Sequence, residues 1–377
     1  MEIAFTSEQN EILQWAKRFA EEVVAPEVLR NQSEKISDSL LKRLSDEKFM
    51  VLLVPEAEGG SGLDALSFSL VITELAKVCS STSITVAVTN MIADVLVKCA
   101  TKAQKEMFLS QLVDGRSWTA SFCLTENSSG SDAGSLKTRA EKTGNHYRLN
   151  GEKIYVTNGR WSNFFLVMAR TGEAGSKGIS AFLVDRNQKG VSIGKEEDKM
   201  GLTASSTVQM SFEDVEVAED RVLLSPGEGF KVAMQALDGG RISVASQALG
   251  TALSALAAGI SYAKEREQFG KPIAEFQAIQ WKLANAATEL AASEMLIRRA
   301  AWMKSQGQNI TREASMAKLF STEAAIRVCN EMIQVFGGYG YIKEYPVERY
   351  YRDVRVTALY EGTSEIQRVV ISRELLK

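Results

Sequence analysis

A glutamate on a predicted turn near the end of the chain is the first candidate for chemistry. Glu361 lies in TALYEGTSEIQRVV (residues 357–370), where Ser364 and Gln367 have the spacing of a capping box, so we expect a helix to begin there. A carboxylate at such a position becomes a general base when apolar surroundings remove it from water, because desolvation raises a carboxyl pKa. The alternative is a solvated side chain that only helps to start the helix.

Other catalytic side chains are scarce. The single histidine, His146, lies in the turn-like string TGNHYRLNG, which predicts a surface hairpin. One histidine excludes metal centres that need several, and it leaves a Ser-His-Asp arrangement only one possible base. The cysteines are far apart and form no C-x-x-C pair, which favours reduced, buried thiols; they are Cys79, Cys99, Cys123 and Cys329. We therefore expect no metal and assign acid–base chemistry to carboxylates.

Composition limits the class of protein. The chain has 377 residues, of which 45% are hydrophobic and 24% charged, enough for two or three packed units of a soluble protein. Lys and Arg total 44 against 47 Asp and Glu, and no basic tail stands out, so nucleic-acid binding is not expected. No apolar run approaches the length needed to span a bilayer, and the N-terminal segment predicts an amphipathic helix rather than a secretion signal.

Hydrophobic periodicity divides the chain into three blocks. Residues 1–115 repeat apolar positions every three or four residues and predict helices. Residues 116–225 change to a period of two, typical of strands with one buried face. Residues 226–377 return to the helical period, with a long helix expected to begin after LDGGR (237–241). The expected fold class is α+β by blocks: an N-terminal helical domain, a small middle β domain and a C-terminal helical domain.

Six stretches occur in an order and spacing that match known motifs. They are FCLTENSSGSDAG (122–134), YVTNG (155–159), LDGGR (237–241), REQFGKPIAEFQ (266–277), QVFGGYGY (334–341) and YEGTSEIQR (360–368). With the block pattern, they make the whole chain resemble the acyl-CoA dehydrogenase family, and most closely its short-chain (butyryl-CoA) branch. The resemblance implies a C-terminal four-helix bundle, a homotetramer, FAD as cofactor, an acyl-CoA substrate of fatty acid metabolism and an electron-transfer flavoprotein as electron acceptor.

The reaction that the resemblance implies makes specific demands. Desaturating an acyl thioester takes a proton from the α carbon and a hydride from the β carbon, so the site needs a base and a group that stabilises enolate-like charge. Glu361 matches the base of the family. Some members place the base at the position of Gly240, which cannot serve here. The thioester carbonyl is expected to accept hydrogen bonds from the Glu361 N–H and from a flavin ribityl hydroxyl.

The resemblance also implies two sets of binding residues. Positions that match flavin contacts, some of them from a neighbouring subunit, are Phe122, Leu124, Thr125, Tyr155, Thr157, Arg266, Phe269, Gln277, Gln334, Gly337, Gly338, Thr363 and Glu365. Positions that match substrate contacts are Ser131, Asp238, Arg241 and Gly362. From the residues alone, ordinary strand packing, helix capping and a surface charge at Arg241 remain alternatives.

One stretch departs from the family pattern. AVTNMIADVLVKCA (87–100) carries Asn90 and Asp94 where short-chain relatives have small apolar residues and a Gly-Pro, on the helix that lines the acyl pocket. A carboxylate that faces such a pocket is costly unless it is paired or functional. Either Asp94 points to solvent or caps a helix, or Asp94 or Asn90 meets a polar or cyclic acyl group, with Asp94 as a second base for a 1,4-dehydrogenation. There are two smaller departures: Asn127 stands where the family usually has proline, and Tyr155 replaces the more common tryptophan.

Several functions stay open at this point. The same residues could run the reaction backwards as an enoyl-CoA reductase, or act on an acyl group tethered to a carrier protein. A flavin-free paralogue that serves as an interaction protein is the alternative from another class. A bacterial cytoplasm is the expected location, and the mitochondrial matrix is the alternative.

Overall fold

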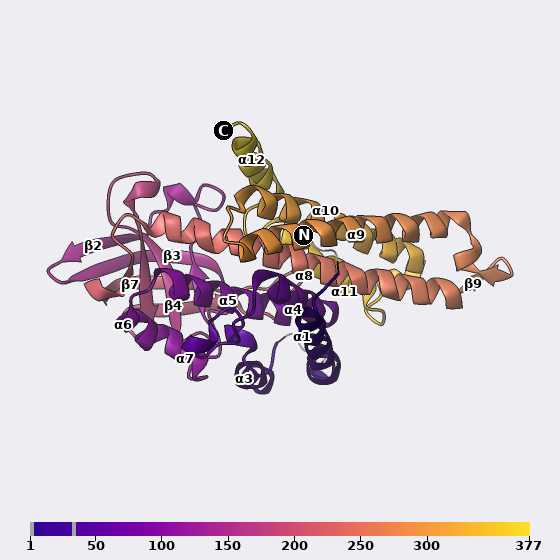
Figure 1. Ribbon diagram of the computed structural model, residues 1–377, viewed down its shortest axis with the longest axis horizontal. Helices are drawn as coiled ribbons and strands as arrows, with labels where there is room; N and C mark the ends of the chain where they lie inside the picture. Colours follow the sequence, from indigo (N-terminus) through magenta and orange to yellow (C-terminus); the bar gives the residue numbers. More distant parts are fainter. Residues whose placement is uncertain (1–3, 32–34) are drawn as a thin grey trace.

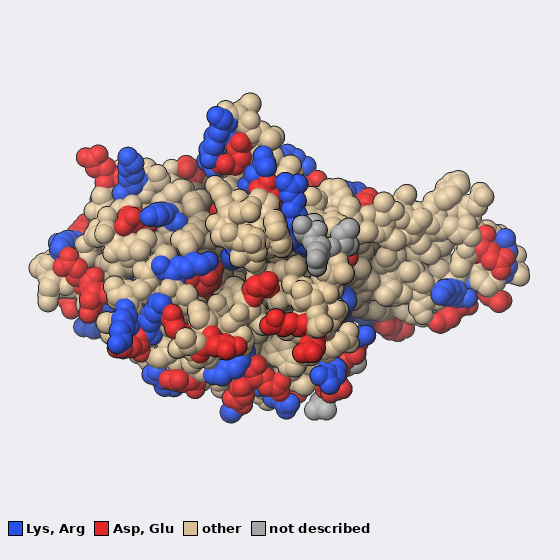
Figure 2. All heavy atoms as spheres, viewed as in Figure 1, with Lys and Arg blue, Asp and Glu red and all other residues tan. Residues whose placement is uncertain are grey.

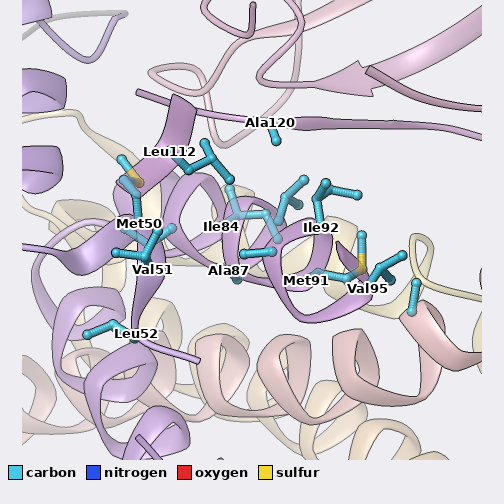
Figure 3. Packing of buried hydrophobic residues seen from close by; sticks show 14 of the residues in the cluster. Met50, Val51, Leu52, Ile84, Ala87, Met91, Ile92, Val95, Leu112 and Ala120 are labelled. Atoms are coloured by element: carbon cyan, nitrogen blue, oxygen red, sulfur yellow. The ribbon is translucent and has the colours of Figure 1, made fainter. Parts of the chain in front are cut away.

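The N-terminal helices pack around α5, an almost wholly buried helix. The computed structural model describes residues 4–31 and 35–377, and the first helices are α1 (Ser7–Phe19), α2 (Ala25–Asn31), α3 (Asp38–Asp46), α4 (Ala65–Val78), α5 (Ser80–Cys99), α6 (Lys102–Gln104) and α7 (Ser110–Val113). Figure 3 shows apolar side chains of α5, such as Ile84, Met91 and Val95, in the same cluster as the turn at Met50 and as Leu112. Because α5 is covered on nearly all sides, its sequence is apolar without a clear polar face.

The middle domain is an eight-stranded sheet. Its strands are β1 (Ser121–Cys123), β2 (Arg139–Thr143), β3 (His146–Thr157), β4 (Phe164–Arg170), β5 (Ile179–Asp185), β6 (Val191–Glu196), β7 (Thr207–Ala218) and β8 (Val222–Leu223). The order is β6-β7-β3-β2-β4-β5-β8, with β1 parallel to β4. Val208, Met210 and Phe212 on β7 are buried, as the period of two predicted. His146 lies opposite Thr143 beside the predicted hairpin turn.

The C-terminal domain is built on long helices. They are α8 (Gly229–Glu265), α9 (Gln277–Ser305), α10 (Thr311–Phe336), α11 (Val347–Arg355) and α12 (Ser364–Leu375), and a small hairpin of β9 (Glu267–Gln268) and β10 (Lys271–Pro272) follows α8. In Figure 1 the sheet lies at one end of an elongated molecule, the β9 hairpin lies at the other end, and α12 projects from the middle with the C-terminus at its tip.

The start of α8 corrects the sequence prediction. The helix begins at Gly229, about three turns before the expected position, and contains LDGGR in its interior. Glycine disfavours a helix interior, but here neighbours pack directly on the helix backbone. A Cβ atom on Gly250 would lie 2.3 Å from the carbonyl oxygen of Thr73, so close packing of α8 against α4 requires glycine there.

The order of the blocks confirms the α+β fold class. Helices run as far as Val113, strands from Ser121 to Leu223, and helices again from Gly229. The boundaries at 115/116 and 225/226 remain our proposal for the domain limits. Two helices, α5 and α8, are long and apolar enough to cross a membrane, which corrects the expectation from the sequence. Their most apolar windows are 83% and 78% buried inside the protein, so packing accounts for their composition.

A buried ion pair fixes the loop after β1. The Nζ atom of Lys153, whose side chain is fully buried, donates to Glu126 Oε1 at 2.7 Å and to the Leu124 carbonyl at 2.9 Å. The carboxylate of Glu126 also accepts from the N–H groups of Lys137 and Thr138. The pair therefore joins both ends of the 124–138 loop to β3.

We expect removal of the two partners to have unequal effects on stability. Glu126→Ala leaves a buried ammonium group and two backbone N–H groups without their acceptor, and should lower the free energy of unfolding by about 3–5 kcal/mol. Lys153→Met should cost roughly half as much, because the carboxylate keeps two backbone donors. Urea denaturation measures both.

The matched control is Glu219→Ala, which breaks the exposed ion pair between Lys142 and Glu219 in the same sheet. It should give no measurable change. Equal effects of Glu126→Ala and Glu219→Ala would contradict the role of the buried pair.

Candidate active site

Glu361 lies on a tight turn between the 3-10 turn Val356–Ala358 and α12. Its φ angle is 53°, in the left-handed region that a non-glycine residue seldom adopts, and Gly362 follows with a φ of 89°. Residues in this region cost free energy and persist only where surrounding contacts impose them. The turn therefore directs the Glu361 side chain to a fixed place.

Side chains from other helices hold this turn. Gln367 Nε2 on α12 donates to the carbonyl oxygens of Glu361, at 3.1 Å, and Gly362, at 2.9 Å. Lys318 Nζ on α10 donates to the Gly362 carbonyl at 2.7 Å. The hydroxyl of Tyr360 donates to Gln247 Oε1 on α8. The base candidate is thus anchored to three helices of one domain.

The predicted capping box at this helix is wrong. The N-cap is Thr363, whose hydroxyl accepts from the Ile366 N–H, and the hydroxyl of Ser364 makes no hydrogen bond within the described residues. Gln367 does not reach back to an N-cap N–H, because its amide binds the two carbonyls of the preceding turn. The left-handed turn at Glu361 shifts the start of the helix by one residue.

One oxygen of the half-buried Glu361 carboxylate is removed from water. Its Oε2 atom is buried without a hydrogen-bond partner in the described part of the chain. A Cβ atom on Gly240 would lie 2.5 Å from Oε2 and 3.2 Å from Met91 Sδ, so a side chain at position 240 would displace the carboxylate from its present place. Burial raises the pKa of Glu361 to about 7, although the positive charges of Arg241 and Lys318 lower it. The carboxylate can therefore accept a proton at neutral pH.

A cavity of about 1350 Å³ contains this carboxylate. Ile84, Val88 and Met91, at helical spacing on α5, form an apolar part of its lining. The cavity extends to the 130–135 loop and to the first turns of α8, so all three domains contribute to it. A thioester with a long polar handle and an apolar acyl group would match this combination of linings.

The structure brings together most of the residues predicted around the cavity. Predicted flavin contacts that line it are Phe122, Leu124, Thr125, Tyr155, Thr157 and Thr363. Predicted substrate contacts that line it are Ser131, Asp238, Arg241 and Gly362. The Tyr155 side chain is 64% exposed in the isolated chain, an unusual degree for an aromatic residue on a strand.

Arg241 is not a surface charge. Its side chain is 5% exposed, and Nη1 donates to Asp238 Oδ1 at 2.6 Å. The other carboxylate oxygen of Asp238 accepts from the Thr311 hydroxyl at 2.8 Å. The Nε atom of Arg241 is buried and has no partner within the described residues, so the ion pair with Asp238 leaves donors of the guanidinium unused.

Other predicted flavin contacts lie elsewhere. Arg266, Gly337 and Gly338 line a second cavity of about 450 Å³, beside Tyr262 and Tyr339. Phe269 lies on the β9–β10 connection and is 93% exposed; Gln277, Gln334 and Glu365 line neither cavity. The β9 hairpin lies far from the sheet in Figure 1. The predicted flavin contacts around the large cavity and those near this hairpin therefore do not meet within one chain.

Asn90 and Asp94 do not line either cavity, which corrects their predicted contact with the acyl group. The fully buried Asn90 donates to the carbonyls of Phe49 and Val86 and accepts from the Leu53 N–H. Asp94 Oδ2 accepts from Lys98 at 2.7 Å and from Lys304 at 3.3 Å, and these lysines outweigh desolvation and lower its pKa. Asn90 is therefore structural, and Asp94 is a paired carboxylate rather than a second base.

The sequence analysis missed the side chains that hold Glu361. Lys318 and Gln367 are both fully buried. A detectable signal existed for Lys318, which follows Ala314 by four residues and precedes Ser321 by three on the buried stripe of α10. A lysine on such a stripe requires a buried acceptor.

Three family descriptions match consecutive parts of the chain. They are "Acyl-CoA dehydrogenase, N-terminal domain" over residues 6–116, "middle domain" over 121–215 and "C-terminal domain" over 227–376. The short-chain specific acyl-CoA dehydrogenase of Megasphaera elsdenii is 41% identical over 387 residues, with all of both chains covered. The caffeyl-CoA reductase-Etf complex subunit CarC of Acetobacterium woodii is 42% identical over 99% of this chain and 100% of that protein. The solved structure of butyryl-CoA dehydrogenase from Megasphaera elsdenii matches with a TM-score of 0.97 at 41% identity and covers 100% of both chains.

Alanine at position 240 should displace the catalytic candidate. Gly240→Ala places a methyl group against Glu361 Oε2, and we expect turnover of a short acyl-CoA to fall roughly 100-fold, because a shift of about 1 Å is sufficient for such a loss.

Gly239→Ala is the matched control on the same helix. Its methyl group would meet only Lys304 Nζ, the end of a flexible side chain, so turnover should stay within about twofold. Equal losses in the two variants would contradict the steric argument.

Asp94→Ala should change stability but not turnover. The substitution removes the partner of Lys98 and Lys304, and we expect it to lower the free energy of unfolding by about 1–2 kcal/mol, with turnover within about twofold. Asp46→Ala breaks an exposed pair of the same spacing with Lys42 and should change neither quantity. A large loss of turnover in Asp94→Ala alone would restore Asp94 to the site.

Proposed function

Because this chain belongs to the acyl-CoA dehydrogenase family, we propose that it oxidises the Cα–Cβ bond of a short or small acyl-CoA thioester with FAD as the hydride acceptor. The observation that carries this proposal is the Glu361 carboxylate, whose Oε2 atom is buried without a partner among the described residues, placed in a cavity that all three domains line. A carboxylate with a pKa near 7 matches the requirement for a base that removes a weakly acidic α proton at neutral pH.

Glu361 supplies two functions in this mechanism. Its carboxylate takes the α proton and becomes the neutral acid, while the hydride leaves the β carbon, so that a double bond forms between the two carbons. Its backbone N–H makes no hydrogen bond within the described residues and is free to donate to the thioester carbonyl oxygen. Glu361 lines the cavity, and an N–H that donates to the oxygen would stabilise the negative charge that develops there.

The residues present fit a bound FAD. When bound, this cofactor supplies the hydride acceptor. Tyr155 offers an exposed aromatic ring for contact with a flavin, and the Thr157 hydroxyl lines the same cavity. In the second cavity, no atom lies within 4 Å of a Cβ atom built on Gly337 or Gly338, so a ligand could approach their backbone closely, and Arg266 suits a pyrophosphate.

We propose a homotetramer in which these two cavities meet across subunits. Large apolar side chains are exposed next in sequence to residues that line the second cavity, namely Phe269 at 93%, beside Gln268, and Tyr341 at 87%, beside Ile342. Trp281 on α9 is 63% exposed. On the face shown in Figure 2, the arm on the right carries few charged groups until its tip. Gln277, Gln334 and Glu365 would then contact a flavin only in the assembly. Exposed aromatic residues and a surface with few charges both favour subunit contacts.

Arg241, Asp238 and Ser131 are our candidates for holding the thioester and the CoA part of the substrate. The Nε donor of Arg241 is unpartnered, and Asp238 with Thr311 fixes the orientation of the guanidinium. Ser131 lies on the loop that the Glu126–Lys153 pair anchors. These groups give the substrate a fixed position relative to Glu361, which is the main requirement for a fast proton transfer.

An electron-transfer flavoprotein is the proposed electron acceptor, and the name of the similar Acetobacterium woodii protein includes such a complex. That protein is called a reductase, so the enoyl-CoA reductase direction is the second candidate. We place the enzyme in a bacterial cytoplasm, since the similar proteins described above come from bacteria. A carrier-protein thioester and a flavin-free paralogue stay as alternatives that the next experiment separates.

The test is anaerobic bleaching of the bound flavin by saturated acyl-CoAs: butyryl, isobutyryl, hexanoyl, glutaryl, cyclohexanecarboxyl and cyclohexenecarboxyl. Butyryl-CoA should bleach the wild-type protein, and the rate should rise with pH through about 7, because only the ionised Glu361 accepts a proton. Glu361→Gln should keep the flavin and lose at least about 1000-fold in rate.

Glu58→Gln, which alters an ion pair with Lys105 outside the cavity, is the control and should behave as wild type. A protein without flavin would remove the enzyme assignment. A flavin that no acyl-CoA bleaches would direct the search to carrier-protein thioesters, and normal bleaching of Glu361→Gln would eliminate Glu361 as the base.

A further inference from the structure

Lys318 is a buried cation beside the turn that carries the base. Its side chain is fully buried on α10, and its Nζ atom donates to the Gly362 carbonyl at 2.7 Å. Lysine is almost never buried in this way unless it is paired. Within the described residues no carboxylate oxygen lies within 4.0 Å of Nζ, so no direct ion pair compensates the charge.

Charges on four elements act on this ammonium group. Burial lowers the pKa of Lys318 to about 8; Glu361 on the turn raises it, Arg241 on α8 lowers it, and Glu365 on α12 and Glu323 on α10 raise it. The largest of these charge effects is that of Glu361. The interaction is mutual, because Lys318 also lowers the pKa of Glu361.

The second cation near Glu361 has a different role. Arg241 forms an ion pair with Asp238 at 2.6 Å, lines the cavity where substrate would lie, and lowers the pKa of Glu361 more than Lys318 does. Lys318 does not line the cavity, and within the described residues it forms no ion pair with a carboxylate. Lys318 is therefore the second cation that acts on Glu361, and it does so from outside the cavity.

We propose that Lys318 is a positioning residue for the reaction: its ammonium group holds the Glu361–Gly362 turn through the Gly362 carbonyl and, together with Arg241, supplies the positive charge that keeps the Glu361 carboxylate ionised. This inference rests on the proposed base role of Glu361. It assigns Lys318 no contact with substrate or cofactor.

The experiment compares Lys318→Gln, Lys318→Met and Lys318→Arg in the flavin-loaded protein. The rate of bleaching by saturating butyryl-CoA is measured from pH 5.5 to 9.5. Without the positive charge, Glu361 holds its proton more tightly, so the rise in rate should move to higher pH by about one unit in Lys318→Gln and Lys318→Met. Relative to wild type, the bleaching rate of these two variants should be about tenfold lower at pH 6, and the difference should become smaller as pH rises. Lys318→Arg should keep the wild-type midpoint.

The Gln variant keeps a donor for the Gly362 carbonyl, so it preserves the test if the Met variant does not fold. Lys42→Met, which removes an exposed, ion-paired lysine on α3, is the control and should leave the profile unchanged. An unshifted midpoint in Lys318→Gln, or an equal loss at every pH, would overturn the proposal. Failure of the proposed function gives a different result, because Glu361→Gln would then bleach normally.

Discussion

The active site depends on keeping one carboxylate both dry and ionisable. In the proposed mechanism, a dry environment makes Glu361 basic enough to take a carbon-bound proton, but the same environment favours its neutral form. Two buried cations on different helices, Arg241 and Lys318, oppose that tendency. Most of the other features of the site follow from this balance, since the cations must be held in place and the carboxylate must have space.

The three blocks of the fold contribute in distinct ways. The C-terminal domain supplies the base, its anchors and the glycine that makes room for it, all on helices that pack against one another. The N-terminal domain supplies an apolar wall through α5, and the β domain supplies exposed aromatic and hydroxyl groups. The position of the base is therefore set within one domain, while the shape of the cavity depends on the contact between domains.

Local patterns predicted the fold better than they predicted the surroundings of the base. The change from helical to alternating periodicity marked the β domain, and Glu361 could be identified from its motif. The start of α8 was wrong because a Gly-Gly pair indicates a break locally, whereas here glycine is required by the carboxylate that packs on it. Asp94 was misread because its partner Lys304 lies 210 residues away along the chain, beyond the reach of any local pattern. Gln367 was read as part of a cap because its true acceptors depend on a left-handed turn that the sequence does not reveal.

The similar proton affinities of Glu361 and Lys318 have a consequence for ligand binding. With pKa values of about 7 and about 8, the two groups titrate over an overlapping range and act as a coupled pair. An acyl group that fills the cavity removes water from the carboxylate and raises its proton affinity further, so binding near neutral pH is linked to proton uptake from the buffer. The measured heat of binding would then depend on the ionisation enthalpy of the buffer, and calorimetry in two buffers would count the protons taken up.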